Sequence, residues 1–295
     1  MSEHTEILDA ALARLQAEYI FPDKAEEADA AIRRALAAGE YDGLDGPKFC
    51  EAVTATFFAA CADKHLRLLW NDEPSDPDED ETDDMFAELS RSLNHGFARV
   101  ERLEGNVGLL DLRLVPAPED GAPLIAASMR LLAGTEALIM DLRKNRGGSP
   151  DTVALWCSYF FGEPVHLNDV YHRKDDLTRQ YWTVPHVDGP RYLGKPIYVL
   201  TSSSTFSGGE ELAYNLKVNG RATLVGETTR GGAHPTEWYP LTPHIAVTVP
   251  TSRSINPITG TNWEGVGIEP HIAVPADQAF DVAYQGALST IGAAA

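Results

Sequence analysis

The sequence predicts a mixed α/β protein in which an N-terminal helical bundle precedes a core with a mostly parallel sheet. In the first 62 residues, apolar side chains recur at spacings of three and four, which is typical of amphipathic helices. From residue 97 onward, short apolar runs alternate with helical segments, and this alternation indicates strand–helix–strand units. A chain of 295 residues is long enough to bury a large core.

Three helices are predicted in the bundle, which we expect to occupy residues 1–71. The first spans about residues 4–21 and ends at Pro22. A second has its apolar side over residues 28–36, and a third covers about 47–62. Their short, glycine-containing connections favour neighbouring helices that pack together.

An acidic linker is expected after the bundle, over residues 72–96. Nine of the thirteen residues from 72 to 84 are acidic, so like charges repel and nothing apolar offsets the chain entropy. A solvated loop is the favoured interpretation. The alternative is a site for a metal or a cationic partner, although the run lacks the glycine and the spaced ligands of a calcium loop.

The α/β core is expected over residues 97–295. A long polar stretch, 164–193, separates its two halves, and the alternating pieces TEWYPL and IAVTVP lie near its end. Its strands are predicted at 107–115, 136–142, 195–202 and 222–227, and its helices at 122–134, 151–161, 208–218 and 278–291.

The composition argues against two classes of partner. Lys and Arg number 24 against 44 Asp and Glu, so the formal net charge is −20, which disfavours nucleic acid and anionic membrane surfaces. No apolar run approaches the roughly 20 residues that span a bilayer, and the N-terminal residues do not resemble a signal peptide. The three cysteines indicate a reducing compartment. We therefore expect a soluble, cytoplasmic protein.

No cofactor or metal is expected. The sequence contains no CxxC or HExxH pattern with convincing metal-ligand spacing. It also has no glycine-rich phosphate loop of the Rossmann or Walker type.

Three glycine-marked turns follow buried strands, at 140–151, 200–211 and 225–235. Ligands bind at such carboxyl ends in open α/β sheets. In the second turn, Ser207 stands where a strand gives way to a helix, and the N–H of Gly208 faces the same space, where it could stabilise an oxyanion. The alternative is that Ser207 and Glu210 form only a capping box.

The first of these turns contains a glycine pair, Gly147 and Gly148, which lets the backbone approach a ligand closely. Its N–H groups could supply the other half of an oxyanion hole. We expect Arg143 and Asn145 to pin this turn rather than to touch a substrate.

Together the turns resemble the tail-specific, or C-terminal processing, serine proteases, a family that includes the tricorn core protease and the interphotoreceptor retinoid-binding protein modules. The resemblance covers roughly residues 97–275 and rests on three motifs in order: DLRKNRGG (141–148), TFSGGEELAYNLKVNGRATLVGE (205–227) and WEGVGIEPHI (263–272). It implies an α/β spiral core like that of ClpP and crotonase, with an N-terminal helical bundle.

The resemblance implies that Ser207 is the nucleophile and that Gly208, with Gly148 or Gly147, forms the oxyanion hole. The bacterial processing proteases pair their serine with a lysine, and the matching slot here is Gly232. The chain contains no lysine from 218 to 295. A serine–lysine dyad is therefore absent, and the base must be another residue.

The tricorn-like branch implies a different base. His65 in DKHLRL resembles its histidine, and Glu264 in WEGVGIEPHI resembles its carboxylate. Ser207 would attack, His65 would act as general base and then acid, and Glu264 would orient the imidazole. Glu264 would meet His65 directly, or through Lys64 or water.

Two further histidines lie near the third turn, His234 and His244. His234 is an alternative base, because it lies close to the slot of the missing lysine.

The sequence thus predicts a serine peptidase that acts through an acyl-enzyme on peptides or unfolded proteins. No PDZ insertion is visible between bundle and core, which argues against recognition of C-terminal tails. Two alternatives remain: a non-catalytic carrier of apolar ligands on the same scaffold, and an esterase or other acyl transferase.

Overall fold

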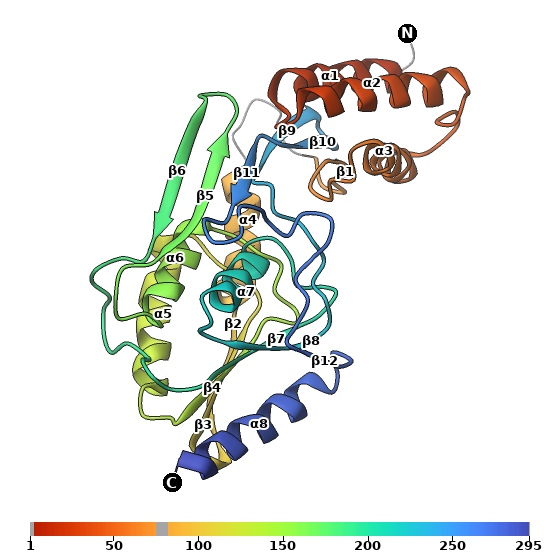
Figure 1. Ribbon diagram of the computed structural model, residues 1–295. Helices are drawn as coiled ribbons and strands as arrows, with labels where there is room; N and C mark the ends of the chain where they lie inside the picture. The colour runs from red at the N-terminus through yellow and green to blue at the C-terminus, as the bar shows by residue number, and fades with distance from the viewer. Residues whose placement is uncertain (1–2, 75–81, 295) are drawn as a thin grey trace. The chain divides into compact units, whose positions relative to one another are not determined.

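The protein, described here from a computed structural model over residues 3–74 and 82–294, folds as two compact units (Figure 1). The bundle unit contains Met1–Met85, Val170–Arg179 and His234–Ser254. The sheet unit contains Phe86–Asp169, Gln180–Ala233 and Ile255–Ala295. The predicted division assigns 97–295 to the core as a whole, whereas two later segments belong to the bundle unit.

The bundle unit combines the three predicted helices with a small antiparallel sheet of order β1-β10-β9. One register pair joins Arg67 to Thr248, which explains why the segment around 234–254 belongs to this unit. Ile245, Val247 and Val249 of this small sheet pack with the helices in a single apolar core. The elements are α1 (Glu3–Glu18), α2 (Pro22–Ala37), α3 (Gly46–Cys61), β1 (Arg67–Trp70), β9 (Thr236–Thr242) and β10 (Ile245–Pro250).

The sheet unit is built on a six-stranded sheet of order β12-β8-β7-β4-β3-β2, in which only β2 runs antiparallel to its neighbour. Figure 1 shows α8 on one face and α5, α6 and α7 on the other. Its strands are β2 (Phe97–Leu103), β3 (Val107–Leu112), β4 (Ala137–Asp141), β7 (Ile197–Thr201), β8 (Thr223–Gly226) and β12 (Ile272–Ala273). Its helices are α5 (Pro118–Leu132), α6 (Pro150–Ser158), α7 (Gly208–Val218) and α8 (Ala279–Ala294).

Burial on both faces explains the continuous apolar runs in the parallel strands. Alternate residues of β3 and β4, such as Val107 and Leu109, join the core under α8, while Leu110 and Leu112 are buried away from that cluster. The predicted strands and helices of this core are confirmed, each within a few residues of its expected bounds.

Two segments differ from the expectation. Thr82–Ser92 form a helix, α4, inside the predicted acidic linker, and residues 75–81 of that linker lie outside the described residues. The polar stretch 164–193 contains a hairpin, β5 (His166–His172) and β6 (Leu177–Trp182), which forms a sheet of order β11-β5-β6 with β11 (Ser252–Ile255). Most side chains of β6 are exposed, so the apolar alternation that identifies a strand is missing there.

Two short 3₁₀ turns, Asn94–Gly96 and Glu104–Asn106, flank β2. Among the described helices, none combines the length and the apolar character needed to cross a membrane.

Candidate active site

The turn between β7 and α7 is fixed to the end of β4 by side chains. Ser202 Oγ donates a hydrogen bond to the Arg143 carbonyl at 2.5 Å, and Thr205 Oγ1 donates to the Leu142 carbonyl at 2.9 Å. β7 itself is buried along its whole length. The first and second glycine-marked turns are thereby held against each other at the carboxyl edge of the sheet.

Ser207 ends this turn in a strained backbone conformation. Its φ is 52° and its ψ is −123°, a left-handed conformation that favours glycine. Such outliers cost about 1–3 kcal/mol and persist where the surrounding structure enforces them, often at functional sites. A serine on a sharp strand-to-helix turn is the arrangement of a nucleophile elbow, which presents the hydroxyl to a substrate. The residue is partly exposed.

The Gly-Gly turn after β4 is pinned by a buried side chain, as the sequence predicts. Asn145 Nδ2 donates to the Leu112 carbonyl at 2.9 Å, and its Oδ1 accepts from the Gly147 N–H at 2.8 Å. Gly148 has a φ of 136°, and a Cβ placed on it would lie 1.9 Å from the Val115 carbonyl oxygen. Only glycine therefore fits at position 148.

The Gly-Gly turn lies directly against the serine turn. A Cβ on Gly208 would lie 2.7 Å from the oxygen and 3.0 Å from the nitrogen of Gly148, and a Cβ on Gly147 would lie 2.6 Å from Ser207 Cβ. Within the described part of the chain, the amides of Gly208 and Gly148 donate to no acceptor, whereas the amide of Gly147 is used by Asn145. Gly208 and Gly148 are thus the candidate pair for an oxyanion hole.

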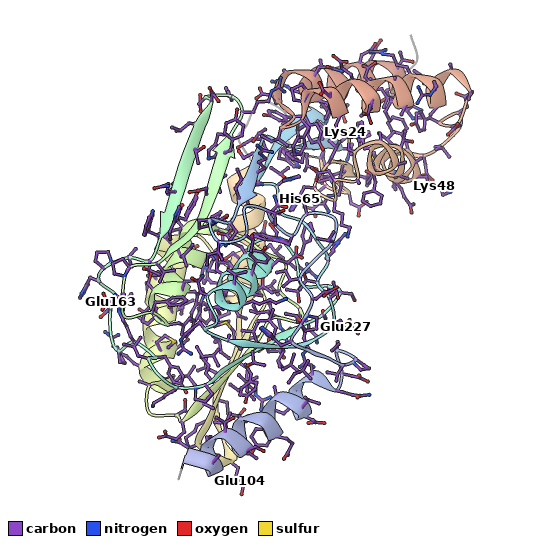
Figure 2. All side chains as sticks on the ribbon, viewed as in Figure 1. Lys24, Lys48, His65, Glu104, Glu163 and Glu227 are labelled. Carbon is purple, nitrogen blue, oxygen red and sulfur yellow. The ribbon has the colours of Figure 1, made fainter. Side chains whose placement is uncertain are left out.

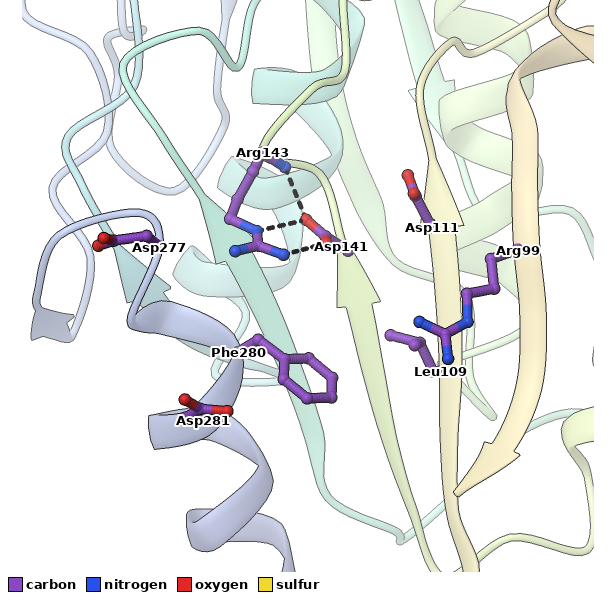
Figure 3. A pocket seen from close by; sticks show the side chains of 8 residues that line it. All are labelled: Arg99, Leu109, Asp111, Asp141, Arg143, Asp277, Phe280 and Asp281. Atoms are coloured by element: carbon purple, nitrogen blue, oxygen red, sulfur yellow. Dashed lines mark hydrogen bonds and ion pairs between the residues drawn. The ribbon is translucent and has the colours of Figure 1, made fainter.

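Ion pairs brace the ends of β3 and β4, the two strands below this turn. Asp111 and Asp141 are register neighbours, and each is bound by the arginine two residues later in the chain. Arg143 also donates to the carbonyl of Ala276 at 2.7 Å, and its hydrogen bonds to Asp141 raise the pKa of its guanidinium. Figure 3 shows the Arg143–Asp141 ion pair in a pocket that is lined by neither Ser207 nor Glu264. Arg143 therefore pins the turn, as expected.

Glu210 joins the second and third turns. Its Oε2 accepts from the N–H groups of Ser207 and Gly232, both at 2.9 Å. Its Oε1 accepts from Thr229 Oγ1 at 2.5 Å and from the Gly231 N–H at 2.6 Å. Burial raises the pKa of this carboxyl, while the four donors act in the opposite direction. The glutamate is therefore a buried hub in addition to half of the predicted capping box.

The third turn also holds Glu264. The Ala233 N–H donates to Glu264 Oε2 at 2.5 Å, and Trp263 Nε1 donates to the Gly232 carbonyl at 2.8 Å. Gly232, at the position of the family lysine, is thus hydrogen-bonded to Glu210 through its amide and to Trp263 through its carbonyl. Through Glu210 and this turn, the segments that carry the predicted nucleophile and the predicted carboxylate are parts of one hydrogen-bonded network in the sheet unit.

His65 belongs to the bundle unit, in the segment between α3 and β1 that Figure 2 marks. Its N–H donates to Asp63 Oδ1 at 2.9 Å, and its carbonyl accepts from Thr248 Oγ1 at 2.6 Å. His234, the alternative base, belongs to the same unit, and its Nδ1 lies 2.7 Å from Asp63 Oδ2. The structure thus reveals a carboxylate, Asp63, that the sequence analysis did not select.

His244 is held by local packing. Its Nδ1 lies 2.9 Å from the Asn71 carbonyl oxygen, and its ring stacks on Trp70 with centroids 5.0 Å apart. These contacts hold the His244 side chain at the end of the β1–β10 pair, so its position has a structural explanation.

A second buried glutamate follows Glu210 on α7. Glu211 is only 4% exposed, and Asn168 Nδ2 donates to its Oε1 at 3.2 Å. Burial raises its pKa to about 8, so the carboxyl is protonated at neutral pH. Sequence reasoning missed this state, because adjacent glutamates at a helix start are more often solvated.

The sequence matches peptidase family S41 over residues 107–274, more than half of the chain. The chain therefore belongs to peptidase family S41, a family of serine-type peptidases. This confirms the predicted resemblance to the tail-specific proteases, and the family is of the class that the sequence predicts.

Two relatives agree with this assignment. A carboxy-terminal-processing protease of Bartonella bacilliformis is 27% identical over 197 residues, which are 65% of this chain and 43% of that protein. The carboxy-terminal processing protease CtpB of Bacillus subtilis is 27% identical over 140 residues, 47% of this chain and 28% of that protein. The chain spans less than half of the length of either relative.

Solved structures share the fold. A lipoprotein from Streptococcus agalactiae superposes with a TM-score of 0.62 at 14% identity, covering 98% of each chain. The photosystem II D1 C-terminal processing protease gives 0.56 at 13% identity, covering 99% of this chain and 98% of that one. The tricorn protease gives 0.62 at 14% identity, covering 99% of this chain and 37% of that one. The predicted α/β protease fold is confirmed.

Proposed function

We propose that the protein is a serine peptidase that cleaves peptide bonds through an acyl-enzyme, with Ser207 as the nucleophile. One observation carries this proposal: a strained serine stands beside two backbone amides, of Gly208 and Gly148, that have no acceptor among the described residues. A capping serine needs neither the strain nor the second amide. An acyl-transfer site needs both the exposed hydroxyl and the paired donors.

In the proposed reaction, Ser207 Oγ attacks the scissile carbonyl and passes its proton to His65. The two amides stabilise the oxyanion of the tetrahedral intermediate, which collapses when the imidazolium gives its proton to the leaving amine. Water then repeats these steps on the ester and releases the acid. Glu264 orients the imidazole and stabilises its charge, either directly or through Lys64 or water.

The base is not the lysine of the bacterial processing proteases. The corresponding residue is Gly232, whose amide bonds to Glu210, and no lysine occurs after residue 217. A second candidate for the base is His234, because a carboxylate hydrogen-bonded to Nδ1 is the arrangement that prepares Nε2 as an acceptor. Single alanine variants at His65 and His234 separate the two assignments, since only loss of the true base abolishes turnover.

Short or unfolded peptides in the cytoplasm are the substrates that we propose. Tail specificity is not part of the proposal, since no PDZ insertion is visible. A carrier of apolar ligands would need no reactive serine, so covalent labelling separates the peptidase from the carrier. Mass spectrometry of a peptide library after incubation separates peptide hydrolysis from esterase or other acyl-transfer chemistry.

The test is labelling with a fluorophosphonate probe. Wild-type protein and Ser204→Ala are expected to label, because Ser204 is an exposed serine on the same turn outside the machinery. Ser207→Ala is expected to lose labelling and to lose several orders of magnitude in turnover. Labelling of Ser207→Ala at the wild-type rate would refute the mechanism, and an unlabelled wild-type protein would favour the carrier.

A further inference from the structure

We propose that Asp63 is a positioning residue for the acid–base chemistry, acting through the two histidines that it binds. This inference rests on the proposed function and concerns the bundle unit alone. Asp63 is 2% exposed, and its carboxylate receives three donors: the Tyr19 hydroxyl at 3.2 Å, the His65 N–H at 2.9 Å and His234 Nδ1 at 2.7 Å. The nearest alternative is a purely structural cluster, so the test must distinguish the two.

The carboxylate is ionised in the folded protein. Burial alone would raise its pKa, but the hydrogen bond and charge of His234, the His65 N–H and the charge of His65 hold the pKa of Asp63 below its usual value. Burial and the charge of Asp63 also raise the pKa of Tyr19, so its hydroxyl keeps the proton that it donates. Asp63 therefore acts only as an acceptor.

Because the carboxylate can only accept, His234 Nδ1 must carry the proton of this 2.7 Å contact. This contact selects one tautomer of the ring, in which Nε2 carries the lone pair whenever the ring is neutral. Its position is fixed as well, since the ring is 6% exposed and packs edge-on against Phe21. Fixing the tautomer and the ring is what the aspartate does in a serine–histidine–aspartate triad.

The other carboxylate oxygen shapes the segment that carries His65. α3 is followed by its C-cap residue, Ala62, which has a φ of 56°. The hydrogen bond from the His65 N–H to Asp63 Oδ1, two residues earlier, then closes a side-chain turn. Thr248 on β10 then ties down the His65 carbonyl at 2.6 Å. The Asp63 carboxylate thus fixes both the ring of His234 and the backbone of His65. Its charge favours the imidazolium that either histidine becomes on taking a proton.

Asp63→Asn tests the proposal with little change in shape. The amide removes the charge that favours the imidazolium of either histidine, and it can donate to His234 Nδ1, which favours the wrong tautomer of that ring. The labelling rate and kcat should therefore fall by on the order of 100-fold, less than the roughly 10⁴-fold loss in the best-studied triad. KM should stay close to the wild-type value. The matched control is Tyr19→Phe, which removes a donor but keeps the carboxylate and should lose far less.

Two measurements distinguish positioning from folding. If Asp63 positions the histidines, Asp63→Asn labels slowly but reaches one probe per chain; a structural role instead gives a reduced final stoichiometry at an unchanged rate. Second, proton NMR of the wild-type protein should show a downfield imidazole N–H resonance that is lost in His234→Ala and kept in His65→Ala. A wild-type labelling rate in Asp63→Asn, or absence of that resonance, overturns the inference.

The outcomes also separate this inference from the proposed function. If Ser207→Ala labels like the wild type, the peptidase mechanism fails whatever Asp63 does. If Ser207→Ala is unreactive and Asp63→Asn is unaffected, only the role of Asp63 fails.

Discussion

Replacing the buried carboxyl of Glu211 with an amide is expected to make the stability of the protein less dependent on pH. Between pH 4.5 and about pH 8, the folded protein holds a proton on Glu211 that the unfolded chain has released. The wild-type protein therefore loses stability as pH rises through this range, because the slope follows the difference in bound protons between the two states. Above pH 8 the carboxyl ionises in the fold as well, and this loss is complete.

The two pKa values set the size of the effect. The difference between 4.5 and about 8 corresponds to about 5 kcal/mol of unfolding free energy across the range. Glutamine does not titrate, and its Oε1 can still accept from Asn168 Nδ2. The free energy of unfolding of Glu211→Gln should therefore lack this dependence on pH, and its excess over the wild-type value should be largest at pH 8.

The assay is urea unfolding at pH 5 and pH 8 for the wild type, Glu211→Gln and the control Glu163→Gln, since the Glu163 side chain is exposed. The free energy of unfolding should fall between the two pH values in the wild type and in the control, and fall less in Glu211→Gln. The same fall in all three proteins would refute the reasoning, because Glu211 would then not be protonated in the fold.

Two substitutions test the proposed site. Glu264→Gln keeps the shape but removes the charge, so kcat should fall by about 10- to 1000-fold with little change in KM, and an unchanged kcat would remove Glu264 from the mechanism. Gly148→Ala should lose at least about 1–3 kcal/mol of stability and most of the labelling, because a Cβ would meet the Val115 carbonyl at a φ of 136°. Gly134→Ala is the matched control, since a Cβ there meets nothing within 4 Å, and equal behaviour of the two variants would contradict the account.

Local patterns in the sequence predicted the elements but not the two units. The buried runs of β4 and β7 and the start of α7 at Gly208 follow from apolar periodicity and from a serine followed by two glycines. The membership of β10 in the bundle unit depends on its pairing with β1, where Arg67 meets Thr248 across 181 residues. No local spacing encodes such a pairing, so the sequence alone predicts one core that extends over residues 97–295.

Motifs in the sequence predicted the local structure of the candidate site but not the partners that lie far apart in the chain. Ser207 and the Gly-Gly turn follow from residue types at the ends of strands, and Asn145 was correctly expected to pin that turn. Asp63 was missed because its partner, His234, lies 171 residues away, and an aspartate before a histidine is ordinary in sequence. Glu211 was missed because protonation depends on burial, which a helix-start motif does not report.

The side chains that surround Ser207 explain how the amides of Gly148 and Gly208 can stay without an acceptor in the described part of the chain. Buried N–H groups turn toward any available acceptor, because each unsatisfied group costs about 1–3 kcal/mol. Asn145 binds the amide of Gly147, and Glu210 binds those of Ser207, Gly231 and Gly232, so the competing donors are already satisfied. The backbone on both sides is thereby fixed, and the amides of the adjacent residues Gly148 and Gly208 are left without an acceptor among the residues that the structure describes. Donors fixed before the reaction need no reorganisation when an oxyanion forms, which is the arrangement that lowers the barrier to acyl transfer.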